Sequence, residues 1–275
     1  MSTIERAMAL LDFFAADRPE IGLSELRALA GRDKATTYRH LCALESAGLV
    51  EQNPVTRRYR IGPAVLRLAH LRELATPRRA SVLQALPGLA EATGETAHAS
   101  ILEGSELRTL DYYASKQHST RVVISDEVLP LHATGSGLAV LAFGPPALLN
   151  AARRRLRRFT DHTAADAATL DAALAAARGS GFGVSHQGYE AGVHGVAVPL
   201  FDDRGGVAGA LAVACVVARV TAELETRIRR ELVAAARVIT ASWGGRIPQA
   251  LEQAWAQSAA APPVRRASAK QRARG

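Results

Sequence analysis

Small polar and basic side chains gather on one face of the segment from Gly31 to Val50. A helix turns by about 100° per residue, which over this segment brings together Ala35, Thr36, Arg39, Ala43 and Ser46. A narrow face with one Arg and no bulky apolar group suits the major groove of DNA, because a guanidinium can bind guanine through two hydrogen bonds. An isolated helix of this kind is more often an ordinary amphipathic surface helix, so the flanking elements must distinguish the two interpretations.

The other face of this helix is suited to packing in a core. Thr37, Leu41 and Leu44 share that face with Gly48. Asp33 is a good N-cap for the first turn, and Gly48 stands where a left-handed residue commonly closes the last one. The pattern therefore predicts a helix over residues 34–47.

Two further helices are predicted before it. Apolar residues at helical spacing indicate a first helix over residues 3–16, with Ser2 or Thr3 as the cap and Arg18-Pro19 as the stop. A second helix over residues 23–30 is capped near Ser24 and closed by Gly31. Two short helices joined by a turn of about three or four residues that contains Gly are typical of a helix-turn-helix.

A short basic hairpin is predicted directly after these helices. Residues 49–51 and 59–61 look like two strands around the turn-forming pair Asn53-Pro54. Three helices followed by such a hairpin form a winged helix-turn-helix. Arg57 and Arg58 then lie at the hairpin tip, where they would meet phosphates or a minor groove. The predicted DNA-binding residues are Lys34, Ala35, Thr36, Tyr38, Arg39, Arg57 and Arg58.

The chain up to about Trp243 resembles the IclR family of bacterial transcription regulators. The resemblance is carried by IERAMALLDFF (4–14), LSELRALAG (23–31), KATTYRHLCALESAGLV (34–50) and YRIG (59–62). Arg32 departs from a position that is typically apolar, and Thr37 from one that is often Val, so the Thr37 hydroxyl needs a partner. The resemblance implies a DNA-binding domain joined to an effector-binding domain, assembled as a dimer of dimers.

Four segments are expected along the chain. Residues 1–62 form the winged helix-turn-helix DNA-binding domain, 63–79 a linker helix, 80–246 the effector-binding and oligomerisation domain, and 247–275 a basic, disordered tail. The linker helix carries an apolar stripe that could pack on the first domain or on a second subunit. The stripe consists of Val65, Leu66, Leu68, Ala69 and Leu71.

The second domain has a mixed pattern of helices and strands. Residues 80–93 form a helix, and residues 95–115 and 193–216 form two hairpins. Helices are expected near residues 137–143, 145–154, 163–179 and 221–243. The fold class is therefore α+β, with a GAF-like antiparallel sheet and flanking helices.

Two stretches of the second domain resemble the pocket-forming segments of the family: PLHATGSGLAVLAFGPP (130–146) and a longer one over residues 181–214. Gly135-Ser136-Gly137 at the start of a helix would present backbone N–H groups to a carboxylate. A tight turn with a helix cap explains these glycines equally well, and the resemblance favours the ligand. The predicted ligand-binding residues are Arg121, Leu129, His132, Gly135, Ser136, Ser185, His194, Gly195, Ala212 and Ala214.

Several of these positions differ from the family pattern. Ser185 stands where an acidic residue is common, Gly195 where Cys is common, and Ala212 and Ala214 where Ser is common. A pocket changed in this way should be roomier and more apolar, which favours a larger organic or aromatic acid. Arg121, His132 and His194 are candidate partners for its carboxylate, although a lone His is more often structural.

Charge and cysteine content add little evidence of their own. The net charge is +8, but residues 247–275 hold five basic residues and one acidic residue, so half of the net charge lies in the tail. The arginines of residues 153–158 are interpreted as a solvated helix end.

Cys42 and Cys215 form no CxxC pair, which argues against a disulfide framework or zinc site. We expect a cytoplasmic protein, since no signal-peptide pattern or membrane-length apolar run occurs.

Enzyme motifs are incomplete in this chain. Thr134 and Leu138 stand at the two Gly positions of a G-x-S-x-G elbow, and His186 and His194 have no clustered third metal ligand. We therefore expect no catalytic residues, metal or cofactor.

The expected function is a transcription regulator that binds double-stranded operator DNA as a homodimer, senses a small-molecule effector and does not contact a membrane. The alternative is a small-molecule-binding enzyme or carrier with an appended basic domain.

The helix over residues 34–47 generates a first prediction. Replacing Arg39 by Ala should weaken operator binding by roughly 1–3 kcal/mol and relax sequence preference at one base pair, because a base contact is lost. Competition binding against operators that vary one base pair at a time measures both effects. An equal loss on every sequence would make Arg39 a phosphate contact instead.

Overall fold

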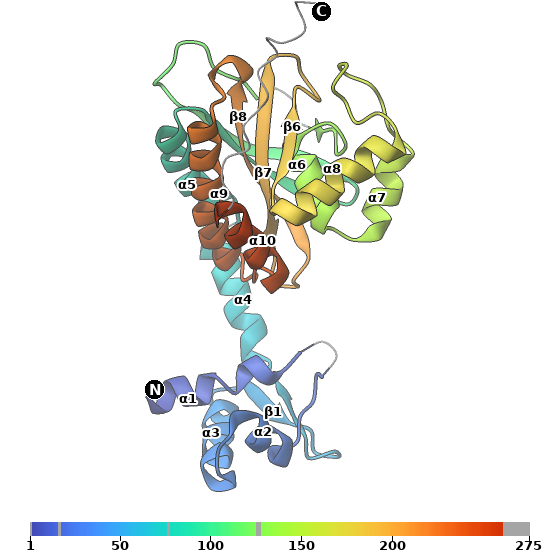
Figure 1. Cartoon of the computed structure of the whole chain (residues 1–275). Helices are drawn as coiled ribbons and strands as arrows, with labels where there is room; N and C mark the ends of the chain where they lie inside the picture. The colour runs from blue at the N-terminus through green and yellow to red at the C-terminus, as the bar shows by residue number, and fades with distance from the viewer. Residues whose placement is uncertain (1, 16–17, 76–77, 125–127, 261–275) are drawn as a thin grey trace, which may run out of the picture. The chain divides into compact units, whose positions relative to one another are not determined.

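The structure is a computed structural model that describes residues 2–15, 18–75, 78–124 and 128–260. The chain divides into two compact units, Met1–Pro77 and Arg78–Gly275 (Figure 1). No helix in the described ranges is long and apolar enough to cross a membrane.

The first unit begins with helices interrupted by a short turn. A capping box formed by Ser2 and Glu5 starts α1, because the Ser2 hydroxyl accepts from the Glu5 amide and the Glu5 carboxylate accepts from the Ser2 amide. The predicted single helix over residues 3–16 is wrong in extent. The chain leaves the α-helix at Ala9 and Leu10 enters the core, with a 3-10 turn, η1, beyond it. The bounds are α1 Thr3–Met8 and η1 Leu11–Phe13.

The next two helices match the predicted ranges closely. They are α2 Leu23–Ala30 and α3 Lys34–Ser46. Asp33 caps α3 by accepting from the Thr36 amide at 2.8 Å. The predicted cap at Ser24 is wrong, since Gly22 is the N-cap of α2 and supplies no side chain, whereas Gly31 closes that helix in the left-handed conformation.

The wing is an antiparallel hairpin that packs on α3. It is formed by β1 Val50–Gln52 and β2 Tyr59–Ile61, with Val50 opposite Ile61. Gly62 must lack a side chain, because a Cβ there would lie 2.3 Å from the Gly48 carbonyl oxygen. The linker helix α4 follows as Ala64–Ala75. The core of this unit consists of Leu10, Ile21, Leu26, Leu41, Leu44, Val50 and Tyr59.

The second unit is organised around one antiparallel sheet with the order β5-β4-β3-β8-β7-β6. Its strands are β3 Thr96–Glu103, β4 Glu106–Ala114, β5 Val128–Leu129, β6 Gly183–His186, β7 Val193–Phe201 and β8 Val207–Val216. Both predicted hairpins are present, as β3-β4 and β7-β8. The two edge strands were not predicted, because runs of two and four residues are too short to give a periodic signal.

Helices cover both faces of this sheet (Figure 1). On one face lie α5 Arg78–Thr93 and α9 Ala222–Ser242, and on the other α6 Gly135–Phe143, α7 Pro146–Arg153 and α8 Ala167–Ser180, while η2 Val217–Arg219 follows β8. Successive side chains along a strand point to opposite faces of the sheet. Val196 and Val198 enter the main core, whereas Ala197 and Ala212 meet Ala139 of α6. The α+β architecture predicted from the sequence is confirmed.

The predicted disordered tail over residues 247–275 is wrong for its first part. Residues Gln249–Ala260 form helix α10, which packs on α8. Trp255 is buried and donates its indole N–H to the Gly181 carbonyl at 2.8 Å. Gly181 permits this approach, since a Cβ there would lie 2.4 Å from the Trp255 ring. The buried side chains of Leu251 and Trp255 thus hold α10 against the domain, although the polar composition of this segment predicted disorder. Residues 261–275 lie outside the described residues.

Trp255 should control the docking of α10. We expect Trp255→Ala to reduce the free energy of docking by about 3–5 kcal/mol, because a large buried ring is removed. Hydrogen exchange followed by mass spectrometry should then show faster exchange in residues 249–260 and unchanged protection in α9. Trp255→Phe is the matched variant, with a loss of about 1 kcal/mol for the missing hydrogen bond. Unchanged protection of α10 in Trp255→Ala would contradict this role.

Candidate DNA interface and ligand pocket

The outer face of α3 is exposed along its length. Lys34, Ala35, Tyr38 and Arg39 are exposed, and Thr36 is half-buried at the capped end of the helix. The polar residue on the inner face, Thr37, is fully buried, and its hydroxyl donates to the Asp33 carbonyl oxygen at 2.9 Å. This bond supplies the partner that a buried hydroxyl requires, so Thr37 can replace an apolar residue in the core.

The two arginines of the wing differ in their surroundings. Arg57 is exposed and adopts a left-handed backbone conformation with φ of 58°. Arg58 instead donates to the Glu20 carbonyl at 2.9 Å and to the Glu25 carboxylate at 2.8 Å. Arg58 thereby fastens the wing to the start of α2, and its guanidinium is already bonded within the protein. Of the predicted pair, Arg57 is exposed at the surface, whereas Arg58 is bonded to Glu20 and Glu25.

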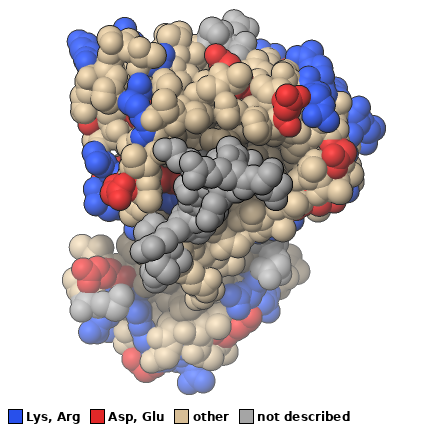
Figure 2. Space-filling view, turned by 45° about the horizontal axis from the view of Figure 1, so that its top comes forward, with Lys and Arg blue, Asp and Glu red and all other residues tan. Residues whose placement is uncertain are grey.

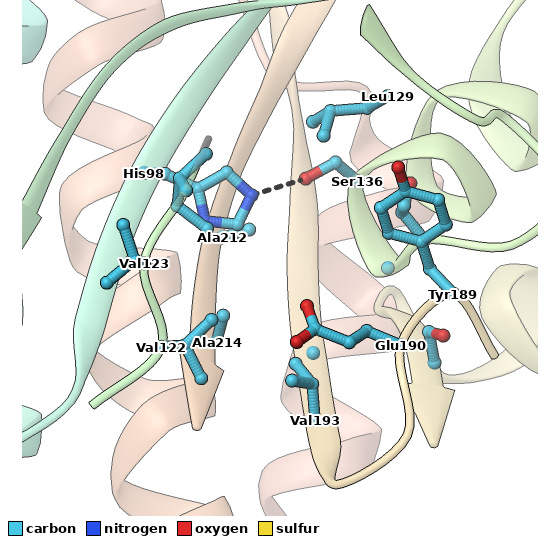
Figure 3. Close-up of a pocket in the computed structure, with 15 residues that line it drawn as sticks. His98, Val122, Val123, Leu129, Ser136, Tyr189, Glu190, Val193, Ala212 and Ala214 are labelled. Carbon is cyan, nitrogen blue, oxygen red and sulfur yellow. Dashed lines mark hydrogen bonds between the residues drawn. The ribbon is translucent and has the colours of Figure 1, made fainter. Parts of the chain in front are cut away.

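A pocket in the second unit lies between the sheet and the N-terminus of α6, and we call it the α6 pocket (Figure 3). Its volume is about 70 Å³. Seven predicted ligand residues line it: Leu129, Gly135, Ser136, Ser185, Gly195, Ala212 and Ala214. They come from β5, α6, β6, β7 and β8, so segments more than 80 residues apart meet in one site.

Three predicted ligand residues are not among those lining the α6 pocket. Arg121 is exposed, His132 lines a different cavity, and His194 points away on the other side of β7 from Gly195. The ring of His194 is buried with its Nδ1 3.4 Å from Nδ1 of His186. These three predicted residues therefore do not line the α6 pocket, because strand alternation and loop position direct them elsewhere.

The pocket also contains residues that the sequence reasoning missed. They are His98, Val122, Val123, Ile124, Thr134, Tyr189, Glu190 and Val193. His98 could have been found from strand pairing, since it lies directly opposite Ala212 in the β3-β8 register. The remaining residues are mostly in loops, where no periodic pattern indicates which side chains turn inward.

Glycines bring the start of α6 close to the sheet. A Cβ on Gly135 would lie 2.9 Å from the Gly195 carbonyl oxygen, and one on Gly183 would lie 2.2 Å from the Gly135 carbonyl oxygen. Thr134 caps the helix by accepting from the Gly137 amide at 3.0 Å. Packing and capping therefore explain Gly135 and Gly137, and the same geometry brings Gly135 and Ser136, at the start of α6, to the pocket. The first amides of a helix lack partners within the helix, and here the Gly137 amide is bonded to the Thr134 cap.

His98 is the buried ionisable group of the pocket. Its Nε2 lies 3.3 Å from the Ser136 hydroxyl, as Figure 3 shows, and its Nδ1 has no hydrogen-bond partner among the described residues. Burial lowers the pKa of His98 to about 4, so the ring is neutral at pH 7. Whichever nitrogen carries the proton, the His98–Ser136 pair retains hydrogen-bonding capacity that a ligand could satisfy.

Charge is distributed unevenly around the pocket. Its lining includes no Lys or Arg in the described part of the chain, and Glu190 contributes a carboxylate from an exposed position. Figure 3 shows Tyr189 and Glu190 on the side opposite His98 and Val123. The positive end of the α6 dipole is thus the feature that favours an anion, and it acts from the side of Ser136. No group of three or more His, Cys, Asp or Glu residues within the described ranges could hold a metal ion.

The low pKa of His98 predicts a pH dependence of stability. Between pH 6.5 and about 4 the unfolded chain binds a proton that the folded protein excludes, so the free energy of unfolding decreases as pH falls through this range. The difference of about 2.5 between the two pKa values corresponds to about 3 kcal/mol. Urea unfolding followed by tryptophan fluorescence reports the second unit alone, because Trp243 and Trp255 are the only tryptophans.

The variant His98→Gln should remove this contribution to the pH dependence. His118→Gln, at an exposed position, is the matched control and should retain the wild-type pH dependence. An identical pH dependence in His98→Gln and wild type would exclude a neutral, buried His98.

Comparisons with known proteins agree with the two-unit arrangement. Residues 3–54 match the family model described as the IclR helix-turn-helix domain, and residues 71–241 match the C-terminal domain of the bacterial transcriptional regulator IclR. A solved IclR transcriptional regulator from Silicibacter sp. TM1040 is 42% identical, with a TM-score of 0.81 over 91% of this chain and 99% of that one.

Two functionally named relatives are also similar over most of their length. The glycerol operon regulatory protein of Streptomyces coelicolor is 29% identical over 86% of this chain and 92% of the relative. The HTH-type transcriptional regulator BhcR of Paracoccus denitrificans is 31% identical over 76% of each chain. These relatives are regulators, which excludes the enzyme alternative. One family match covers a DNA-binding helix-turn-helix domain, and another covers a ligand-binding C-terminal domain. The chain therefore belongs to the IclR family of bacterial transcription regulators.

Proposed function

We propose that the protein is a regulator that binds a palindromic operator and responds to a small organic acid bound in the α6 pocket. The observation that carries the effector assignment is the meeting of a helix N-terminus with the neutral His98–Ser136 pair in an otherwise largely apolar cavity. Because the protein works on the bacterial chromosome, we place it in the cytoplasm.

DNA recognition is assigned to the exposed face of α3 and to the wing. Arg39 and Thr36 read bases, Lys34 and Tyr38 contact flanking phosphates or bases, and Arg57 contacts a phosphate from the wing. Exposure of the α3 side chains and the left-handed turn at Arg57 support this assignment. One short helix contacts too few base pairs to specify a site, so two copies related by a two-fold axis are required.

The linker helix offers a surface for that pairing. Leu66, Leu68 and Leu71 on α4 are 76%, 47% and 49% exposed within the single chain. Leu68 and Leu71 share one side of α4, since positions three apart lie about 60° from each other around a helix, whereas Leu66 lies on the opposite side. Exposed apolar side chains of this size are typical of protein–protein contacts. We propose a homodimer formed through this surface, and a dimer of dimers as the complete assembly.

The effector is proposed to bind in a fixed orientation. Its carboxylate faces the amides of Gly135 and Ser136, where the α6 dipole favours a negative charge and the neutral His98–Ser136 pair supplies a hydrogen-bond donor. Glu190 repels a second negative charge at the far side and accepts a hydrogen bond from a ligand hydroxyl. The modest volume of the pocket favours a small acid. The departures of Ser185 and Gly195 from the family pattern, in contrast, predicted a larger one.

A DNA-binding experiment tests the whole assignment. We expect full-length protein to bind DNA from upstream of its own gene in a gel shift, with a footprint over two half-sites spaced by about one helical turn or a multiple of it. A panel of small and aromatic acids, including glyoxylate, pyruvate and benzoate, is then added. Absence of DNA binding at moderate salt, with or without these acids, would reject the proposal.

Substitution at Gly195 separates the two activities. A Cβ at Gly195 would lie 3.8 Å from the Gly135 nitrogen, so side chains there fit the strand and occupy the pocket. We expect Gly195→Ala to weaken the response to the effector and Gly195→Val to abolish it, while DNA binding without effector stays within about twofold of wild type. A full response in Gly195→Val would exclude the α6 pocket as the effector site.

A further inference from the structure

A second cavity lies beside the end of α7, and we call it the α7 cavity. Its volume is about 270 Å³, close to four times the 70 Å³ of the α6 pocket. One part of its wall is apolar and is formed by Leu107, Val128, Leu131, Ala152 and Phe159. Arg155 and Arg157 contribute two guanidinium groups, whereas the α6 pocket has no Lys or Arg in its described lining.

These two arginines belong to the basic run over residues 153–158, which the sequence alone indicated to be a solvated helix end. In the structure, the arginines of this run have different surroundings. Arg153 pairs with Asp171, whereas the Arg157 guanidinium lies over the Phe159 ring at 4.4 Å from its centroid. Figure 2 shows basic side chains at both the left-hand and the upper right-hand margins of this face, with acidic side chains among them. Arg155 and Arg157 therefore combine positive charge with a concave apolar surface.

The backbone that carries Arg157 is held in place. Nε2 of His132 lies 2.8 Å from the Arg157 carbonyl oxygen and 3.2 Å from its amide nitrogen. His132 is buried, and its ring lies 5.7 Å from that of Phe159. This contact gives His132 a positioning role, since it ties the arginine-bearing loop to the segment between β5 and α6.

We propose that the α7 cavity is a second ligand site, specific for an organic monocarboxylate with an apolar body. Arg155 and Arg157 bind the carboxylate through charge-assisted hydrogen bonds, and the apolar wall receives the hydrocarbon. Glu106 also lines the cavity, and its carboxylate is paired with Arg108 at 2.7 Å. Two guanidinium groups match a single carboxylate, and the apolar wall gives no partner to a second one. The proposal does not depend on what the α6 pocket binds.

The two cavities share structural elements. Leu129 lines both, and Phe159 of the α7 cavity meets Tyr189 of the α6 pocket edge-on, with centroids 4.8 Å apart. A ligand that shifts Leu129 or Phe159 alters the wall of the other site. Occupancy of one cavity should therefore change affinity at the other by the same factor in both directions.

Calorimetric titration of the full chain with three probes tests the proposal: benzoate, cyclohexanecarboxylate and hexanoate. The background is Gly195→Val, in which the α6 pocket is filled. In that background we expect at least one probe to bind with a Kd below about 10 mM. Adding Arg155→Gln and Arg157→Gln together should weaken this binding by at least about tenfold.

The matched control is Arg154→Gln with Arg158→Gln, which removes the same charge from the same run at residues that do not line the cavity. Its Kd should stay within about twofold of the background. A second variant, Ala151→Phe, fills the cavity without changing charge and should also abolish binding. Circular dichroism confirms that each variant is folded.

Three results would overturn the second site. The first is that none of the three probes binds the Gly195→Val protein, and the second is an equal loss in the two double variants, which would indicate general charge attraction. The third is unchanged binding in folded Ala151→Phe. A change of effector response in Gly195→Val without any of these results concerns the α6 pocket alone, so failure of the proposed function and failure of the second site are distinguishable.

Discussion

The close approach of α6 to the sheet is the constraint on which the ligand-binding unit depends. Gly135 and Gly183 stand where a Cβ would lie within 2.9 Å of a backbone atom across this contact. Backbone therefore meets backbone at the start of α6, and only small side chains, Ala139 against Ala197 and Ala212, lie between the helix and the sheet further along. The same approach brings the first amides of α6 to the cavity, so that packing and a possible anion site arise from one geometric feature.

Charge is handled in opposite ways in the two units. The outer face of α3 leaves Lys34 and Arg39 exposed, where they remain hydrated until a polyanion approaches. In the α6 pocket, burial keeps His98 neutral, and the Ser136 hydroxyl lies beside it. A buried neutral imidazole beside a hydroxyl favours partners by hydrogen-bond geometry, whereas exposed basic side chains attract polyanions over longer distances.

The α7 cavity gives the second unit a contrasting site close to the first. Its two guanidinium groups supply the positive charge that the lining of the α6 pocket lacks, and Leu129 together with the Phe159–Tyr189 contact connects the two walls. Contiguous packed side chains of this kind can carry coupling between sites when they have two alternative arrangements. A sensor with two unlike cavities could respond to two acids rather than one.

Local patterns in the sequence determined most of the fold and the exposed face of α3. Helical spacing, Asp33 and Gly48 defined α3, and alternation defined both long hairpins, because these signals depend on neighbours a few residues apart. Tertiary structure decided what those signals cannot carry. The pairing of β3 with β8 brought His98 opposite Ala212, and strand alternation directed His194 away from the pocket. The absence of a side chain at Gly181 allows Trp255 to pack there, and this contact holds α10 in place. Arg58 was likewise assigned by its distant partners Glu20 and Glu25. In each case the deciding contact joins residues far apart in the chain, and sequence periodicity contains no record of such contacts.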